Sequence, residues 1–172
     1  MTLNLTLGAW QVNLMSTTAD RNELKPPLVG ALLRLPWEVV RARMLSGLHA
    51  RGYRDLVPAH LNVLQYPGPH GLSPSELASQ LRMSKQAANY LLGQMEQLGY
   101  LERRPERADP RRKRIWLSPR GRRALRAIRE IVAEVEAEWR QELGAERFDE
   151  FMKLLRELNS AVGASATTHG LP

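Results

Sequence analysis

Residues 73–121, SPSELASQLRMSKQAANYLLGQMEQLGYLERRPERADPRRKRIWLSPRG, decide the fold of this chain. Ser73 and Glu76 form a Ser-x-x-Glu capping box, and the proline between them suits the first position of a helix. A second helix is expected to begin at Ser84, because serine is a favoured N-cap residue. The first helix should therefore end near Arg82, which leaves room only for a tight turn.

The residues after Ser84 predict a helix with one apolar and one polar side. Side chains at three- and four-residue steps form the apolar side, namely Ala88, Leu91, Leu92, Met95 and Leu98. Two helices joined by a short turn, with the small Ala78 where they cross, fit a helix-turn-helix. A solvated polar face alone needs no function, but its place on the second helix favours DNA contact.

The start of this second helix carries the expected base and phosphate contacts. Gln86, Asn89 and Tyr90 lie on its polar side, where recognition helices meet base edges. Glutamine and asparagine can pair bidentately with adenine. Ser84 and Lys85 stand at the helix N-terminus, which attracts phosphate.

A basic hairpin is expected after Gly99, which can cap the second helix at its C-terminus. Residues 100–104 and 113–117 are rich in strand-forming residues, and Asp109-Pro110 between them is typical of a type I turn. The segment 103–126 holds 11 of the 25 lysines and arginines and only two acids. Clustered cations repel one another unless an anion neutralises them. Nucleic-acid contact is therefore favoured over a charged edge that merely resists aggregation.

Four of these motifs resemble, in order and spacing, those of the MarR family of winged helix-turn-helix transcriptional regulators. They are LSPSELASQLRMS at 72–84, MEQLGYLERR at 95–104, Asp-x-Arg at Asp109 and Arg111, and LSPRG at 117–121. In layout the resemblance covers roughly residues 61–158. Two residues depart from it. Arg82 occupies a turn position where glycine is common in the family, and Ser118 replaces the more usual threonine.

The resemblance implies roles for residues of the hairpin, which would be the wing. The arginine of Asp-x-Arg typically reaches the minor groove in the family, which implies this role for Arg111, with Asp109 orienting it by a salt bridge. Arg112 and Lys113 are expected to meet phosphate, and Arg103 is a further expected DNA contact.

The resemblance also implies a cleft between the DNA-binding and dimerisation parts, which in many relatives accepts small aromatic anions. Trp37, His49 and His60 fall in this region and are the expected contacts of such an effector. The alternative is that both histidines only pack, as histidines beside apolar residues more often do. Trp116 either packs on the helices or is exposed, and packing in the core is the expectation.

The rest of the chain divides into helical and flexible segments. Leu72 is expected in a very short strand, and Pro36 is expected to kink or break the first helix near Leu35. The helices expected before and after the DNA-reading unit each carry an apolar stripe. These stripes are expected to pack against each other and against the same helices of a second copy. The expected segments are a flexible arm at 1–24 or a short strand added to a partner, a helical dimerisation segment at 25–57, the winged helix-turn-helix domain at 58–118, a helical dimerisation segment at 119–163 and a flexible tail at 164–172.

Composition narrows the function further. The net charge of +7 and the pI of about 10.4 favour an anionic partner, and half of the 18 acids follow residue 129, so the basic footprint is local. The absence of cysteine excludes disulfides, thiol nucleophiles and cysteine-based zinc sites. No apolar run approaches the roughly 18 residues of a membrane helix, and no signal peptide is evident, so a cytoplasmic protein is expected. No catalytic motif appears, so neither an enzyme nor a metal or cofactor is expected.

Together these observations predict a mainly helical protein with a small β-hairpin wing. The expected function is that of a homodimeric regulator that binds double-stranded DNA, with two recognition helices about 34 Å apart on a pseudo-palindromic operator. Repression is the commoner outcome in the resembling family, and a small ligand could release the DNA. The alternative is a protein-interaction module whose basic hairpin binds an acidic protein. RNA is less favoured, because double-stranded RNA hides its major groove.

Overall fold

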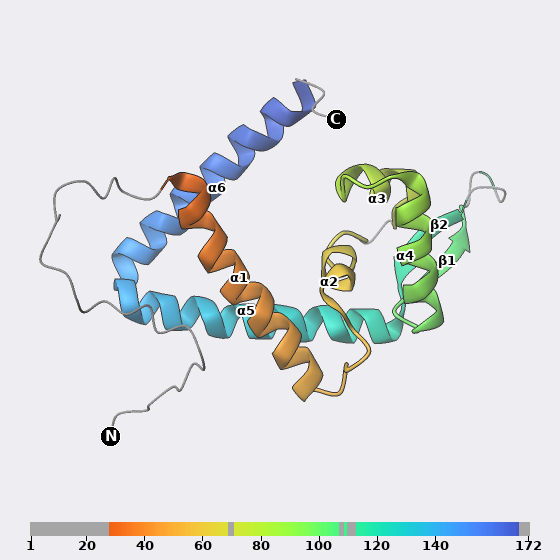
Figure 1. Cartoon of the computed structure of the whole chain (residues 1–172), viewed down its shortest axis with the longest axis horizontal. Coiled ribbons are helices and arrows are strands. Elements are labelled where there is room, and N and C mark those ends of the chain that lie inside the picture. The colour runs from red at the N-terminus through yellow and green to blue at the C-terminus, as the bar shows by residue number, and fades with distance from the viewer. Residues whose placement is uncertain (1–27, 69–70, 107–108, 110–112, 169–172) are drawn as a thin grey trace, which may run out of the picture.

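The structure is a computed structural model that describes residues 28–68, 71–106, 109 and 113–168. Within these residues the chain forms six helices and a two-stranded antiparallel hairpin, which lies at one edge of the molecule beside α4 (Figure 1). The helices are α1 (Val29–Ala50), α2 (Pro58–Leu64), α3 (Pro74–Gln80), α4 (Lys85–Gln97), α5 (Pro119–Leu143) and α6 (Ala145–Thr168), and the strands are β1 (Leu101–Pro105) and β2 (Lys113–Leu117). The predicted mainly helical fold with a β-hairpin is confirmed.

The helix-turn-helix of α3 and α4 begins at the predicted caps. The Ser73 hydroxyl accepts a hydrogen bond from the Glu76 N–H at 3.1 Å, and the Glu76 carboxylate accepts one from the Ser73 N–H at 2.7 Å. The Ser84 hydroxyl caps α4 by accepting the Ala87 N–H at 3.1 Å. The predicted apolar side of α4 faces the core, where four residues are buried, namely Ala88, Leu91, Leu92 and Met95.

Both helices end in the same backbone motif but with different residues at its left-handed position. After α4, Gly99 has φ +76°, and its N–H and the next one donate to carbonyls three and five residues back at 2.9 and 2.8 Å. After α3, Arg82 has φ +50°, and the equivalent hydrogen bonds are 3.1 and 3.0 Å long. Both are Schellman motifs. The left-handed conformation costs a residue with a Cβ about 1 kcal/mol relative to glycine.

The wing lies beside α4 and is joined to the segment before α3. β1 and β2 pair in the register Leu101↔Leu117 to Pro105↔Lys113, and Leu72 forms an isolated bridge to Ile115. The predicted strands and the short strand at Leu72 are thus confirmed. The predicted turn at the hairpin tip lies partly outside the described residues, which include Asp109 but not residues 107–108 and 110–112.

The long helix α5 connects the winged domain to the other helices. Its 25 residues span about 37 Å. Ser118 caps it by accepting the Gly121 N–H at 3.0 Å. Gly121 is required there because a Cβ would overlap the Tyr100 carbonyl, so the start of α5 packs directly on the backbone that follows α4.

Helices α1 and α6 pack against α5 (Figure 1). Met44 and Leu48 of α1 share one buried cluster with Ile131 of α5 and with the core of the winged domain. Arg43 holds α1 on α5 through a bidentate pair with Glu138, with distances of 2.7 and 3.0 Å. At the other end of α5, α6 turns back after Gly144. None of the helices described is long and apolar enough to cross a membrane.

Two expectations about the ends of helices differ from the structure. Pro36 was expected to kink or break the first helix near Leu35; a break does not occur, because α1 continues through Pro36. Proline leaves the carbonyl of Leu32 without its helical donor, but Leu32 is exposed, so water can replace that donor. Helix α6 reaches Thr168, so the tail predicted from residue 164 begins inside a helix. The predicted arm at 1–24 lies outside the described residues.

Candidate nucleic-acid interface

The polar side of α4 forms an exposed surface at the edge of the molecule. Gln86, Asn89 and Tyr90 are all exposed, and Tyr90 is 70% exposed. The Tyr90 hydroxyl accepts a hydrogen bond from Gln94 Nε2 at 3.1 Å, which orients the ring along the helix. Ser84 and Lys85 are exposed at the N-terminal end. The structure thus brings five predicted contact residues together on one surface.

The wing presents its charged end beside the same end of α4. The strands run alongside α4, so the ends of β1 and β2 that lead to the hairpin tip lie near the start of α4 (Figure 1). Lys113 is exposed at the beginning of β2, and Asp109 is partly exposed. Arg111 and Arg112, the other predicted contacts of the wing, lie outside the described residues.

Arg103 differs from the other predicted contacts, because an acid of the recognition helix holds it. Its Nε lies 2.9 Å from Glu96 Oε2 in the last turn of α4. Glu96 is 12 residues beyond Ser84, which along a helix is about 18 Å. The structure therefore places Arg103 near the C-terminal end of α4, apart from the base-reading residues.

Arg114 fixes the wing to the start of α3. Its guanidinium donates to the Gly71 carbonyl at 2.9 Å and pairs with Glu106 at 3.3 Å and Glu76 at 3.7 Å. Hydrogen bonds from the backbone and side chain of Ser73, together with the Arg114 charge, lower the pKa of Glu76. In the sequence Arg114 is one of many clustered cations, and nothing there distinguishes this positioning role.

A second network joins α4 to α5, and the sequence did not predict it. Arg120 donates to both carboxylate oxygens of Asp55 at 3.1 and 2.9 Å and to the Leu98 carbonyl at 2.8 Å. The Tyr100 hydroxyl donates to Asp55 at 2.6 Å, and Arg120 lies 4.4 Å from the centre of its ring. Burial, with the nearby Asp55 carboxylate, raises the pKa of Tyr100. The α1–α2 loop, the end of α4 and the start of α5 are thus held as one unit.

The three residues predicted to contact an effector do not form one site. Trp37 is 48% exposed near the start of α1, and His49 follows it by 12 residues, or about 18 Å along the helix. His49 Nε2 lies 2.8 Å from the Leu56 carbonyl. His60 is buried, and its Nδ1 accepts the Val57 N–H at 3.3 Å. Both imidazoles are therefore engaged with the backbone, as in the alternative packing interpretation.

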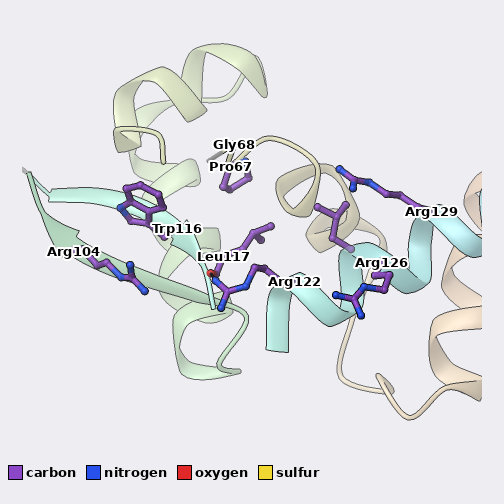
Figure 2. Close-up of a pocket in the computed structure, with 9 residues that line it drawn as sticks. Pro67, Gly68, Arg104, Trp116, Leu117, Arg122, Arg126 and Arg129 are labelled. Atoms are coloured by element: carbon purple, nitrogen blue, oxygen red, sulfur yellow. Dashed lines mark hydrogen bonds between the residues drawn. The ribbon is translucent and has the colours of Figure 1, made fainter. Parts of the chain in front are cut away.

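A groove lined by arginines lies elsewhere, between the wing and α5 (Figure 2). Its volume is about 500 Å³. We call it the arginine groove, and its lining includes Arg104, Arg122, Arg126 and Arg129 together with Pro67, Trp116, Leu117 and Leu125. Its lining includes no acidic residue among those described. The Arg104 guanidinium lies 5.6 Å from the centre of the Trp116 ring. The expectation that Trp116 packs in the core is therefore corrected, because its half-buried ring faces this groove and not the buried cluster.

Capped helices, a bridging strand and a hairpin wing, joined to long packing helices, define a winged helix-turn-helix protein. Residues 54–112 match the model of the MarR family. This segment of the chain is therefore of the MarR-family type.

Known relatives agree with this assignment. The Transcriptional regulator HosA of Escherichia coli O127:H6 is 35% identical over 68 residues, which are 40% of this chain and 50% of HosA. The chain therefore matches about half the length of its curated relatives. The Mycobacterium tuberculosis MarR family protein Rv2887 in complex with DNA is 26% identical, with a TM-score of 0.60 over 77% of this chain and 98% of that chain. Its complex with salicylic acid is equally similar, at 26% and 0.60 over 78% and 98%.

Proposed function

We propose that this chain is a sequence-specific regulator of transcription that binds double-stranded DNA as a homodimer and acts as a repressor. The observation that carries the proposal is the exposed polar side of α4 next to the charged end of the wing. A major groove about 12 Å wide admits one helix of this kind. The similarity to a protein that was solved in complex with DNA supports it further.

The contacts divide into reading and positioning groups. Gln86 and Asn89 have the amide groups that recognise adenine, so they would specify sequence. Lys85 and Lys113 would bind phosphate, which fixes the register of the protein on the duplex. Arg111 of the wing would reach the flanking minor groove, with Asp109 as its orienting partner.

The dimer is proposed from the apolar surface that one copy leaves open. Large apolar side chains are exposed along α1 and α6, among them Leu32, Leu33, Leu35, Phe151, Leu154, Leu158 and Val162. Exposed large apolar side chains that gather on two helices of one copy are typical of an interface. A second copy covers both helices at once and gives two recognition helices, which the two half-sites of a pseudo-palindrome require.

Selection of bound sequences from a random duplex pool tests this function. The wild-type protein should select a two-fold symmetric motif, and Gln86→Ala or Asn89→Ala should relax the base preference at one position of each half-site. Gln97→Ala is the matched control, because Gln97 is exposed at the opposite end of α4. A wild-type selection without any motif would overturn sequence-specific binding. A Gln86→Ala or Asn89→Ala protein that kept full discrimination would overturn the reading role of that residue.

An effector site is a second candidate function, and the arginine groove favours it. Four guanidinium groups and the Trp116 ring suit a planar organic anion. The relative solved with salicylic acid points to the same class of ligand. We therefore propose the arginine groove, in place of Trp37, His49 and His60, as the effector site. A small aromatic acid would bind there, and its binding would cause the protein to release DNA.

Calorimetric titration with salicylate tests the effector site. Arg126→Ala should weaken binding about tenfold, since one charge-assisted hydrogen bond is lost. Arg123→Ala is the control, because Arg123 is exposed on the same helix but does not line the groove. Equal affinities of both variants and the wild type would place any salicylate site elsewhere.

A protein-interaction module remains the alternative, with the wing bound to an acidic protein. Electrophoretic mobility shifts with random duplex DNA separate the two functions, since a DNA-binding protein retards the duplex and loses affinity steeply as salt rises. Neither function is enzymatic.

A further inference from the structure

We propose that Arg82, in the turn between α3 and α4, binds a DNA phosphate, and that its left-handed backbone conformation is kept for this contact. The inference rests on the proposed function, because it requires α4 to enter a major groove. The family resemblance places glycine at this position, so the contact would be particular to this chain.

The two Schellman motifs of the helix-turn-helix provide the comparison. Their hydrogen-bond patterns are equivalent, and Gly99 meets the backbone requirement without a side chain. Arg82 is the only non-glycine residue with a positive φ among those that the structure describes. Because the turn itself needs no side chain, the guanidinium is what the protein gains by placing arginine there. An observed backbone outlier of this kind points to a function for the residue that carries it.

The surroundings of Arg82 leave its charge available. Two other cations of the winged domain, Arg103 and Arg114, are paired with Glu96 and Glu106. In the described part of the chain, Arg82 has no such acidic partner within ion-pair distance, and its side chain is exposed. An exposed cation without an internal partner is free to meet an external anion.

The position of Arg82 identifies that anion. It lies two residues before Ser84, the N-cap of α4, and three before the exposed Lys85. In a helix-turn-helix the first helix crosses the phosphate backbone while the start of the second enters the groove. The turn between them therefore lies along the strand that borders the groove. Arg82 would extend the phosphate contacts of Lys85 to the next phosphate without reading bases.

Two properties of Arg82→Gly should change in opposite directions. The thermal midpoint should rise by about 2–4 °C, because glycine relieves the left-handed strain. The affinity for DNA should fall about fivefold to tenfold, and the slope of log K against log salt should become shallower by about 0.9 per protomer. The loss should be similar for every sequence, because a phosphate contact carries no base preference.

The experiment measures unfolding by circular dichroism and binding by fluorescence anisotropy. The probe is a fluorescein-labelled duplex of about 30 base pairs, long enough for two half-sites one helical turn apart, taken from the pool selected by the wild type. Arg82→Lys keeps the charge and the strain and should restore the salt slope. Arg82→Asn removes the charge in a residue that tolerates the left-handed region and should bind like Arg82→Gly. Arg147→Ala is the control for net charge, because Arg147 is exposed on α6, at the far end of α5 from the winged domain.

The outcomes separate this inference from the proposed function. If the wild type binds the duplex and Arg82→Gly matches it in affinity and salt slope, the inference is overturned and the regulator function stands. An equal loss of affinity in Arg147→Ala also overturns it, because net charge alone would then explain the effect. If the wild type does not bind the duplex at all, both proposals fail.

Discussion

His60 shows how a single buried side chain links helix capping to the pH dependence of folding. The residue is 4% exposed, and its Nδ1 accepts the Val57 N–H at the start of α2. Burial lowers the pKa of His60, against a hydrogen bond with Gln94 and the charge of Asp55, which act in the opposite direction. The folded protein therefore favours the neutral ring, which alone leaves Nδ1 free to accept.

The sign of the resulting pH effect follows from the direction of this shift. Because the folded pKa lies below the unfolded value of about 6.5, the unfolded chain takes up the proton first as the pH falls. The contribution of His60 to stability is thus complete above that value and is lost as the pH falls toward the folded pKa. Urea unfolding between neutral and mildly acidic pH should show a steeper loss for the wild type than for His60→Asn, whose amide can accept the same bond without titrating. Parallel pH profiles would contradict this.

The contacts of individual residues were predictable where they depend on local spacing. The exposure of Gln86, Asn89 and Tyr90 follows from helical periodicity once the cap at Ser84 is recognised. The pairing of Arg120 with Asp55 spans 65 positions, and no local pattern relates two such residues. The same reason explains why the arginine groove was missed, since its cations come from β1 and α5 and meet only in the folded chain.

At the scale of elements, prolines in two helices have opposite consequences. Pro58 stands at the start of α2, where the missing N–H has no helical partner. Pro36 lies inside α1 and removes a hydrogen bond from an otherwise continuous helix. Helix starts and ends were predicted well from caps, prolines and glycines. The continuity of α1 was not predictable, because it depends on solvent access to the carbonyl that proline leaves unpaired.

Pro36→Ala should stabilise the protein by about 1–3 kcal/mol, because it restores a helical hydrogen bond and removes a steric conflict. Thermal unfolding measures the gain. Pro58→Ala is the matched control and should give no gain, since proline suits the first helical position. A lower midpoint for Pro36→Ala would mean that the proline supports a bend that the dimer requires.

At the scale of the whole molecule, the winged domain is the proposed reading end, and the exposed apolar faces of α1 and α6 are the proposed assembly end. One buried cluster spans the winged domain, α1 and α5, whereas most side chains of α6 remain open. The reading end could be predicted from motifs. The extent of the open surface could not, because an apolar stripe in a sequence does not show which side chains other helices cover.

Replacement of two leucines on α6 tests the assembly end. Leu154→Glu together with Leu158→Glu should give a monomer in sedimentation velocity and weaken operator binding by about 100-fold or more, because the second half-site no longer binds as part of the same molecule. Both leucines are about half exposed, at 55% and 48%, so their replacement should leave the fold of one copy intact. Lys153→Glu alters the net charge equally on the same helix and should stay dimeric. A double variant that still sedimented as a dimer would locate the interface elsewhere.

The network of Asp55, Tyr100 and Arg120 at the N-terminal end of α5 has a mechanical consequence. Since the guanidinium fastens the recognition helix to one end of a rod about 37 Å long, a tilt of only about 5° at that joint displaces the other end by about 3 Å. Arg120→Ala or Asp55→Ala removes one of the two charges at this joint. Either variant should therefore bind operators over a wider range of half-site spacings, while the base preference within each half-site persists. The half-site spacing that the protein accepts would then depend on three residues that do not contact DNA.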